Sequence, residues 1–191
     1  MAAITLCIFS FVTWKQLQYW QDSVTLFRYS LDATSNNYVA YNNLGIGLYD
    51  RGDIRGAIHH YSEALRINPY HADARYNLGN ALARQGKMAE AVVQLKEAVR
   101  IRPRSAKYHN NLGYVLALQG NEAEAITHFR ESIRIEPDYA KAYNNLGSAL
   151  LHQGRLDEAI ESYREALRIN PDFKLAKDNM KRALAMQNKG K

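Results

Sequence analysis

Toward the C-terminal end of the chain, hydrophobic residues recur at intervals of three and four positions, the spacing that places side chains on one face of a helix. Tyr143, Leu146 and Leu150 form one such stripe, and a second stripe begins at Ala159. Gly154 lies between the two stripes, and glycine most easily adopts the positive φ with which many helices end. The pattern therefore predicts two amphipathic helices joined by a tight turn.

This helix pair is one of four copies that follow one another at a constant, 34-residue interval. Glycine and proline mark the copies, because glycine fits the turn between helices and proline lacks the N–H that a continuing helix would need. One helix pair of this size cannot bury its own apolar face, so the copies are expected to stack. The columns that keep the interval include Pro69, Pro103, Pro137 and Pro171; Gly52, Gly86, Gly120 and Gly154; and Leu44, Leu78, Leu112 and Leu146.

The columns follow the pattern aromatic, Leu-Gly, Ala, aromatic, Ala, Pro, and by that pattern the chain resembles the tetratricopeptide repeat (TPR) family. The fourth copy matches throughout, whereas the second has Arg75 and Leu95 at the aromatic positions. The third copy has His109 for the first aromatic and Ser132 for the second alanine. The resemblance implies an all-α fold, a right-handed superhelical solenoid of antiparallel helix pairs. Its repeats are TPR 1 at 38–71, TPR 2 at 72–105, TPR 3 at 106–139 and TPR 4 at 140–173.

Two shorter helical segments flank the repeats. Residues 15–37 are predicted to form a half-repeat helix, because Phe27 lies one repeat interval before Tyr61, and Ser35 stands where proline is expected. Residues 174–191 are predicted to form a C-terminal capping helix and a basic tail that close the solenoid. The apolar face of this capping helix is predicted to hold Leu175, Met180, Ala183 and Leu184.

Residues 1–14 form an apolar segment that admits two interpretations. Residues 2–13 carry no charge and precede Trp14 and Lys15, residue types that anchor helices at a membrane interface. Because a helix needs about 20 residues to cross a bilayer, one interpretation is the end of a transmembrane helix that tethers the repeats outside the cytoplasm. The other is a degenerate first helix that packs on Phe27 and caps a cytoplasmic solenoid.

The order of the segments carries a second, shorter resemblance. The apolar segment is followed by Trp20, Asp22, Ser23 and Phe27, and then by the repeats. This order is similar to the C-terminal part of polytopic glycosyltransferase-like membrane proteins that bear extracytoplasmic repeats. The resemblance implies an accessory domain that presents acceptor polypeptide for O-glycosylation, with the catalytic part absent from this chain.

The formal charge of +6 is concentrated at the C-terminal end of the chain. Residues 174–191 contain six Lys or Arg residues and one Asp, so this segment alone contributes +5. The repeats are nearly neutral, which is not typical of a nucleic-acid-binding groove. The charge distribution therefore predicts no nucleic-acid partner.

A column of asparagines keeps the same repeat interval, one position before each core leucine. Asparagine is disfavoured inside helices, because its amide competes for backbone hydrogen bonds, so four copies need a reason. In the family this stripe of the first helices lines the concave groove, and the column resembles that of the nucleocytoplasmic N-acetylglucosamine transferase. Amides can bind the backbone of an extended peptide, but they can equally bond to the neighbouring helix. The candidate peptide-binding residues are Asn43, Asn77, Asn111 and Asn145, with Asn42, Tyr76, Asn110, Asn144, Tyr49, Asn80, Arg84, Tyr114, Lys107 and Lys141 around them.

The sequence predicts no catalytic residue, no metal site and no cofactor. His59 and His60 are adjacent and therefore point about 100° apart on a helix, unlike the i, i+4 pairs that share a metal ion. His109, His128 and His152 are expected in three separate contexts, without cysteine or carboxylate at ligand spacing. Phosphate-binding loops and nucleophile motifs are not found in the sequence either.

These observations together predict a non-catalytic protein-interaction module that binds an extended peptide or partner segment in the concave groove. If residues 2–14 insert in a membrane, the module is membrane-tethered and extracytoplasmic, periplasmic or lumenal. The alternatives are the accessory glycosyltransferase domain and a free cytoplasmic scaffold. The oligomeric state does not follow from the sequence.

Overall fold

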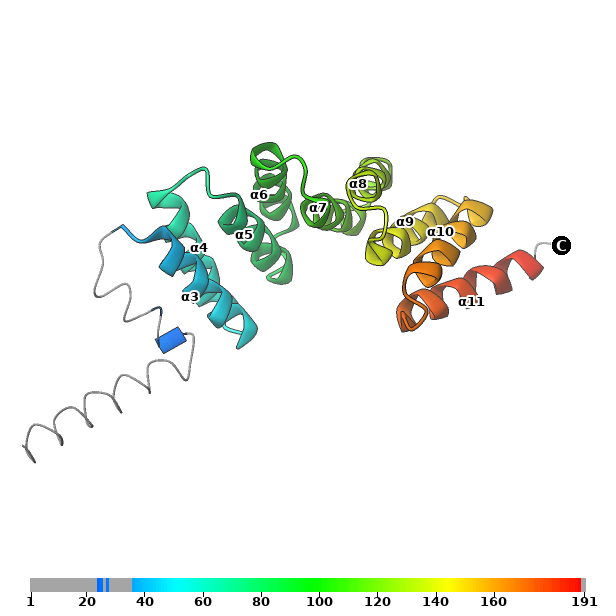
Figure 1. The fold of residues 1–191 in the computed structure, drawn as a ribbon, viewed down its shortest axis with the longest axis horizontal. Coiled ribbons are helices and arrows are strands. Elements are labelled where there is room, and N and C mark those ends of the chain that lie inside the picture. Colours follow the sequence, from blue (N-terminus) through cyan, green and yellow to red (C-terminus); the bar gives the residue numbers. More distant parts are fainter. Residues whose placement is uncertain (1–23, 26, 28–35, 190–191) are drawn as a thin grey trace, which may run out of the picture. The chain divides into compact units, whose positions relative to one another are not determined.

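The computed structural model describes residues 24–25, 27 and 36–189, and these ranges contain helices and turns but no β-strand (Figure 1). The predicted apolar segment 1–14 and most of the predicted half-repeat helix 15–37 lie outside the described residues. The helices are α3 (Tyr38–Asp50), α4 (Ile54–Ile67), α5 (Ala72–Arg84), α6 (Met88–Ile101), α7 (Ala106–Leu118), α8 (Glu122–Ile135), α9 (Ala140–His152), α10 (Leu156–Ile169) and α11 (Lys174–Lys189).

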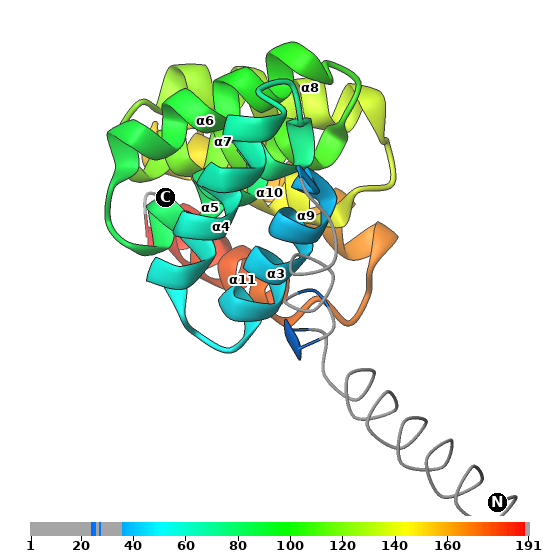
Figure 2. The same cartoon turned by 90° about the vertical axis from the view of Figure 1, so that its left-hand side faces the viewer.

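The helices belong to two compact units, one ending at Gln85 and the other beginning at Gly86. In the first unit α3 packs on α4, α4 packs on α5, and α3 also contacts α5. In the second unit each helix from α6 to α11 packs on the next, and α9 contacts both α7 and α11 (Figure 1, Figure 2). The predicted all-α solenoid of helix pairs is confirmed. Odd-numbered helices are the first helices of the repeats, and even-numbered helices are the second.

Glycine ends the first helix of each pair, as predicted at Gly154. The N–H of Gly154 donates to the carbonyl of Leu151 at 3.0 Å, and the N–H of Arg155 donates to that of Leu150 at 2.9 Å. These two bonds are the Schellman motif, which requires a left-handed residue at its centre. The four turn glycines have φ angles of +85° at Gly52, +86° at Gly86, +79° at Gly120 and +74° at Gly154.

A second glycine allows the two helices of a repeat to approach each other. A Cβ atom on Gly147 of α9 would lie 2.7 Å from Cε1 of Tyr163 on α10. The Tyr163 side chain is only 1% exposed, and its hydroxyl donates to the Ser148 hydroxyl at 3.2 Å. The missing side chain of Gly147 therefore makes room for the Tyr163 ring. Gly45 stands in the same relation to Tyr61, and Gly113 to Phe129.

The departures from the family pattern in TPR 3 are buried and hydrogen-bonded. Ser132 is fully buried, and its hydroxyl donates to the carbonyl of Ala106 at 2.8 Å, which links α8 to α7. Because a buried hydroxyl without a partner would cost free energy, this bond explains how serine fits where alanine is usual.

The last helix buries only part of the predicted face. Ala176 and Ala183 of α11 are fully buried, whereas Leu175 is 54% exposed and Leu184 is 37% exposed. Ala176 and Ala183 lie one repeat interval after Ala142 and Ala149, positions of α9 that are also buried. Leu184 corresponds to Leu150, which is buried in a repeat that has both helices, but no second helix follows α11 in the described part of the chain. The described helix therefore has the character of the first helix of a further repeat.

A membrane span needs a helix that is both long and apolar. None of the described helices combines the two properties.

Candidate functional site

The predicted asparagines take part in a side-chain hydrogen-bond network that joins successive first helices. In the first unit, Asn77 Nδ2 of α5 donates to Asn42 Oδ1 of α3 at 3.0 Å. The same bond recurs in the second unit, from Asn145 of α9 to Asn110 of α7 at 2.9 Å. Asparagines thus bond to the neighbouring helix, which is one of the two alternatives that the sequence left open.

A second set of bonds joins adjacent asparagines on the same helix. Asn110 Nδ2 donates to Asn111 Oδ1 at 3.1 Å, and Asn144 Nδ2 donates to Asn145 Oδ1 at 3.4 Å. Asn179 of α11 donates to Asn144 Oδ1 at 3.0 Å. The five side chains therefore form one continuous chain of donors and acceptors across α11, α9 and α7.

The asparagines of the network occupy two adjacent columns, which we call the inner and the outer column. The two columns differ in burial. Asn42, Asn110 and Asn144 are at most 5% exposed, so they act inside the network and hold their neighbours in place. Asn43, Asn77, Asn111, Asn145 and Asn179 are half-buried and reach the surface. In TPR 2 the inner position is Tyr76, which is 6% exposed.

The network leaves hydrogen-bonding capacity at the surface. A primary amide has two N–H donors and an oxygen with two lone pairs. Asn145 uses one N–H toward Asn110 and one lone pair toward Asn144. One donor and one acceptor therefore remain. They are enough to bond the C=O and the N–H of one peptide unit.

The stripe that carries the outer asparagines is accessible along each first helix. In α7 it consists of Lys107, Asn111, Tyr114 and Leu118, and Tyr114 and Leu118 are 50% and 53% exposed. In α9 it consists of Lys141, Asn145, Ser148 and His152, and in α11 of Leu175, Asn179, Arg182 and Met186. We refer to these twelve positions as the first-helix stripe of the second unit.

The candidates in the first unit are placed differently. The guanidinium of Arg84 lies 5.0 Å from the centre of the Tyr49 ring, a cation–π contact between α5 and α3. Arg84 is exposed, and Tyr49 and Asn80 are half-buried.

Sequence reasoning missed Asn179 and its neighbours on α11. Asn179 lies one repeat interval after Asn145 and continues the column, so the interval was a sufficient signal. It was overlooked because residues 174–191 contain no Leu-Gly pair and no proline and were interpreted as a capping helix with a tail.

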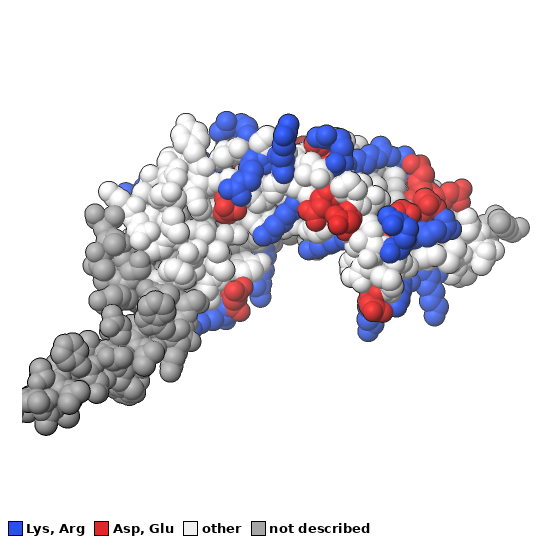
Figure 3. All heavy atoms as spheres, in the orientation of Figure 1, with Lys and Arg blue, Asp and Glu red and all other residues white. Residues whose placement is uncertain are grey.

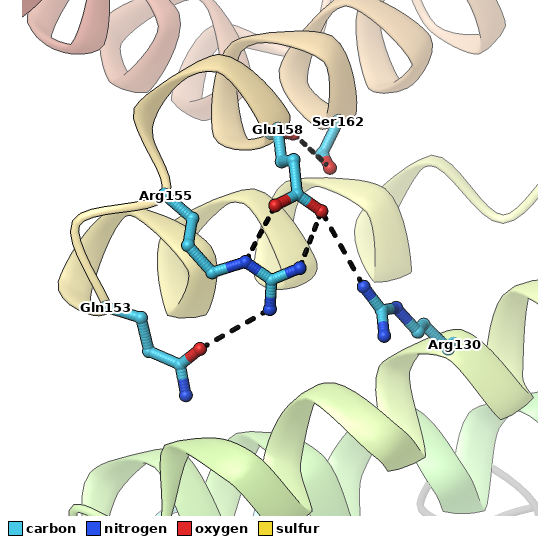
Figure 4. A network of polar contacts seen from close by, with 5 residues as sticks. All are labelled: Arg130, Gln153, Arg155, Glu158 and Ser162. Carbon is cyan, nitrogen blue, oxygen red and sulfur yellow. Dashed lines mark hydrogen bonds and ion pairs between the residues drawn. The ribbon is translucent and has the colours of Figure 1, made fainter.

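Most charged side chains on the second helices are paired within their own turn or with the neighbouring helix. Arg155 donates two bonds to Glu158, at 2.7 and 2.6 Å, and Arg130 of α8 lies 3.8 Å from the same carboxylate (Figure 4). These guanidinium groups hold the pKa of the Glu158 carboxyl below its usual value, first through the hydrogen bond from Arg155.

On the face in Figure 3, Lys and Arg side chains lie among Asp and Glu side chains. A column of Glu–Arg pairs three residues apart repeats along the second helices: Glu63–Arg66, Glu97–Arg100, Glu131–Arg134 and Glu165–Arg168.

The expectation that His109, His128 and His152 lie in separate contexts without a carboxylate is wrong. The Nδ1 atoms of His109 and His128 are 3.1 Å apart, although 19 residues separate them in the chain. His152 Nδ1 lies 3.0 Å from Glu122 Oε1. Burial and the neighbouring His109 lower the pKa of His128. In the described residues no three His, Cys, Asp or Glu side chains are grouped so as to share a metal ion.

Two tetratricopeptide repeat family models match the chain, one over residues 42–106 and the other over residues 104–172. The human protein described as Protein O-mannosyl-transferase TMTC1 is 36% identical over 71 residues, which are 37% of this chain. That match spans only 8% of the length of the human protein.

Solved structures give a longer match. A crystal structure of MamA protein superimposes with a TM-score of 0.73 at 26% identity, covering 81% of this chain and 85% of MamA. The structure of YrrB, described as a TPR protein with an unusual peptide-binding site, gives a TM-score of 0.72 at 25% identity, covering 83% of this chain and 81% of YrrB.

Proposed function

Because the chain belongs to the tetratricopeptide repeat family, we propose that it is a non-catalytic protein-interaction module that binds an extended peptide along its first-helix stripe. The observation that carries this proposal is the remaining donor and acceptor of Asn145, an amide that two other hydrogen bonds already hold in place. A fixed amide loses little conformational entropy when it binds, which favours recognition of a peptide backbone. The similarity to YrrB, whose description names a peptide-binding site, supports the same proposal.

The stripe also indicates which side chains the peptide carries. Three of its twelve positions in the second unit are basic, Lys107, Lys141 and Arg182, and none is acidic. Tyr114 and Leu118 offer exposed apolar surface on α7. A peptide with apolar and acidic side chains is therefore the expected ligand class, with its backbone on the asparagines.

The proposal is tested by selecting ligands and then removing the amides. Phage-displayed peptides of random sequence are selected on the chain, and the dissociation constant of a selected synthetic peptide is measured by fluorescence anisotropy. Replacing both Asn111 and Asn145 by alanine removes several bonds of about 1 kcal/mol each, so we expect binding about tenfold weaker or more. Tyr114→Ala is expected to weaken binding as well.

Two controls make this experiment decisive. Val93→Ala removes a side chain that is 57% exposed on the second helix α6, and it should leave binding unchanged. Circular dichroism and thermal unfolding show whether the double variant still folds. If the folded double variant binds the peptide as tightly as the parent chain, the asparagines serve only the network and the proposal fails.

A second candidate function rests on the similarity to human TMTC1, which is described as a Protein O-mannosyl-transferase. In this alternative the chain is an accessory, membrane-tethered and extracytoplasmic domain that presents acceptor polypeptide to a glycosyltransferase part. The genomic reading frame on the 5′ side of the Met1 codon separates the two candidates. Several hydrophobic spans encoded there, with an acidic motif in an early loop, would support the accessory domain, and a stop codon directly upstream would contradict it.

A further inference from the structure

His109 and His128 face each other across the two helices of TPR 3. Their Nδ1 atoms are 3.1 Å apart, and their ring centres are 5.3 Å apart. The same pair of positions holds Tyr41 and His60 in TPR 1, which stack with ring centres 5.9 Å apart, and Tyr143 and Ser162 in TPR 4. Two histidines with facing nitrogens are therefore particular to TPR 3 among the four repeats.

The distance between the two nitrogens fits a shared metal ion. Two nitrogen ligands at about 2.0–2.1 Å from one ion are about 2.9 Å apart at a right angle and about 3.3–3.4 Å apart at the tetrahedral angle. The observed 3.1 Å lies between these values. Small rotations of the two rings would therefore suffice to place both Nδ1 atoms on one ion.

The other nitrogen of each ring has an oxygen acceptor nearby. His109 Nε2 lies 3.0 Å from the carbonyl oxygen of Pro103, which can only accept, so Nε2 carries the proton and Nδ1 keeps its lone pair. His128 Nε2 lies 3.9 Å from Glu124 Oε1. Metal-bound histidines usually donate their second N–H to a backbone carbonyl or a carboxylate. The Pro103 carbonyl meets this condition for His109, whereas the Glu124 carboxylate lies beyond hydrogen-bond distance of His128 and is paired with Lys96 at 2.8 Å.

The pair can be reached from solvent. An open pocket of about 520 Å³ is lined by both histidines together with Thr127, Arg130, Glu131 and Arg134. Glu131 is held by two hydrogen bonds from Arg134, at 2.7 and 2.6 Å, so its carboxylate is already engaged. An ion bound between the histidines would therefore complete its coordination with water.

We propose that His109 and His128 form a two-histidine site for a first-row transition-metal ion of the Zn²⁺, Ni²⁺ or Cu²⁺ class. Imidazole nitrogen suits these ions, whereas Mg²⁺ and Ca²⁺ prefer oxygen ligands. Binding requires the proton of His128 to sit on Nε2, toward Glu124, and not on Nδ1, where it would form the direct bond to His109. The site is independent of the peptide-binding proposal, because neither histidine belongs to the first-helix stripe.

Isothermal titration of the full chain with ZnCl₂ and with NiCl₂ at neutral pH measures the affinity. Long-range ¹H–¹⁵N spectra of the imidazoles identify the nitrogens that bind. We expect one site per chain, with the Nδ1 resonances of His109 and His128 shifted by the metal. In His128→Gln the affinity should fall by about tenfold or more, because one of two protein ligands is lost.

The other repeats of the chain show which residues can replace the two histidines. Gln94 occupies the position of His128 in TPR 2, and Tyr41 and Tyr143 occupy the position of His109 in TPR 1 and TPR 4, so His128→Gln and His109→Tyr are both compatible with the fold. His152→Gln, which removes an exposed histidine outside the pair, should bind the metal as the parent does. Unchanged affinity in both folded pair variants, or metal shifts confined to other histidines, or no binding at millimolar metal, would overturn the proposal.

Discussion

Gly147 shows at the scale of single residues how the helix pair depends on an absent side chain. Replacement by alanine would place a methyl group 2.7 Å from Cε1 of Tyr163, whose side chain is only 1% exposed. Because a buried ring has little room to move, we expect Gly147→Ala to lower the free energy of unfolding by about 1–3 kcal/mol. Urea unfolding followed by circular dichroism measures this change.

A double-mutant cycle shows whether the contact with Tyr163 is the cause. Leu95 occupies the position of Tyr163 in TPR 2, so Tyr163→Leu is a substitution that the fold already accepts elsewhere. Gly147→Ala should cost less in the Tyr163→Leu background than in the parent, because the shorter side chain relieves the overlap. Additive effects of the two substitutions would mean that Gly147 matters for another reason.

The sequence predicted the residues of the helix pair better than those of the asparagine network. The approach of Gly147 to Tyr163 follows from two stripes at helical spacing, which leave few arrangements for the ring. The bonds of Asn145 could not be predicted in the same way, because Asn110 lies 35 residues away and an amide can bond to a helix or to a ligand equally well. The His109–His128 contact was missed because each histidine was judged within its own helix.

At the scale of elements, α11 joins the network through one side chain. Asn179 donates to Asn144 Oδ1 at 3.0 Å, and Asn144 is only 2% exposed. Asn179→Ala would leave this buried acceptor without its partner, which typically costs about 1–3 kcal/mol of folding free energy. We therefore expect a clear loss of stability, measured by urea unfolding.

Another asparagine on the same helix provides the matched control. Asn188 is exposed near the C-terminal end of α11, so Asn188→Ala should change the free energy of unfolding by less than about 0.5 kcal/mol. Equal effects of the two substitutions would indicate that the helix responds to its composition and not to the bond with Asn144.

The face that α11 buries follows from the repeat interval. Ala176 and Ala183 repeat the buried positions of α9, and this relation was present in the sequence at the repeat interval. The helical spacing of Leu175 and Leu184 suggested that these two leucines also belong to the buried face. An amphipathic pattern shows which residues are buried only when the neighbouring elements are known. In α11 the repeat interval was a better guide than the helical spacing.

At the scale of the whole molecule, the fold is built from contacts between helices that are close in the chain. Within each compact unit, a described helix packs on the helices next to it in the chain, and successive first helices in addition contact one another. The sequence predicted this arrangement because the repeat interval specifies one helix pair and its stacking. The net charge was uninformative until its position was known, since residues 174–191 hold most of it.

Nearest-neighbour packing predicts that damage to one repeat stays local. Ala159 of α10 is fully buried, and Ala159→Tyr would overpack its surroundings at a cost of about 1–3 kcal/mol. Because the stability of a solenoid is approximately a sum of repeat and interface contributions, amide hydrogen exchange should accelerate in α9, α10 and α11. Helices α3 to α5 belong to the other compact unit and should keep their protection.

The equivalent substitution in TPR 1 provides the reciprocal experiment. Ala57 of α4 is also fully buried, and Ala57→Tyr should accelerate exchange in α3, α4 and α5 while leaving α10 and α11 protected. A uniform acceleration over all described helices in both variants would show one cooperative unit, in which the two ends of the chain share their stability. Local acceleration in each variant would mean that a ligand bound on α7, α9 and α11 stabilises those helices without stabilising TPR 1.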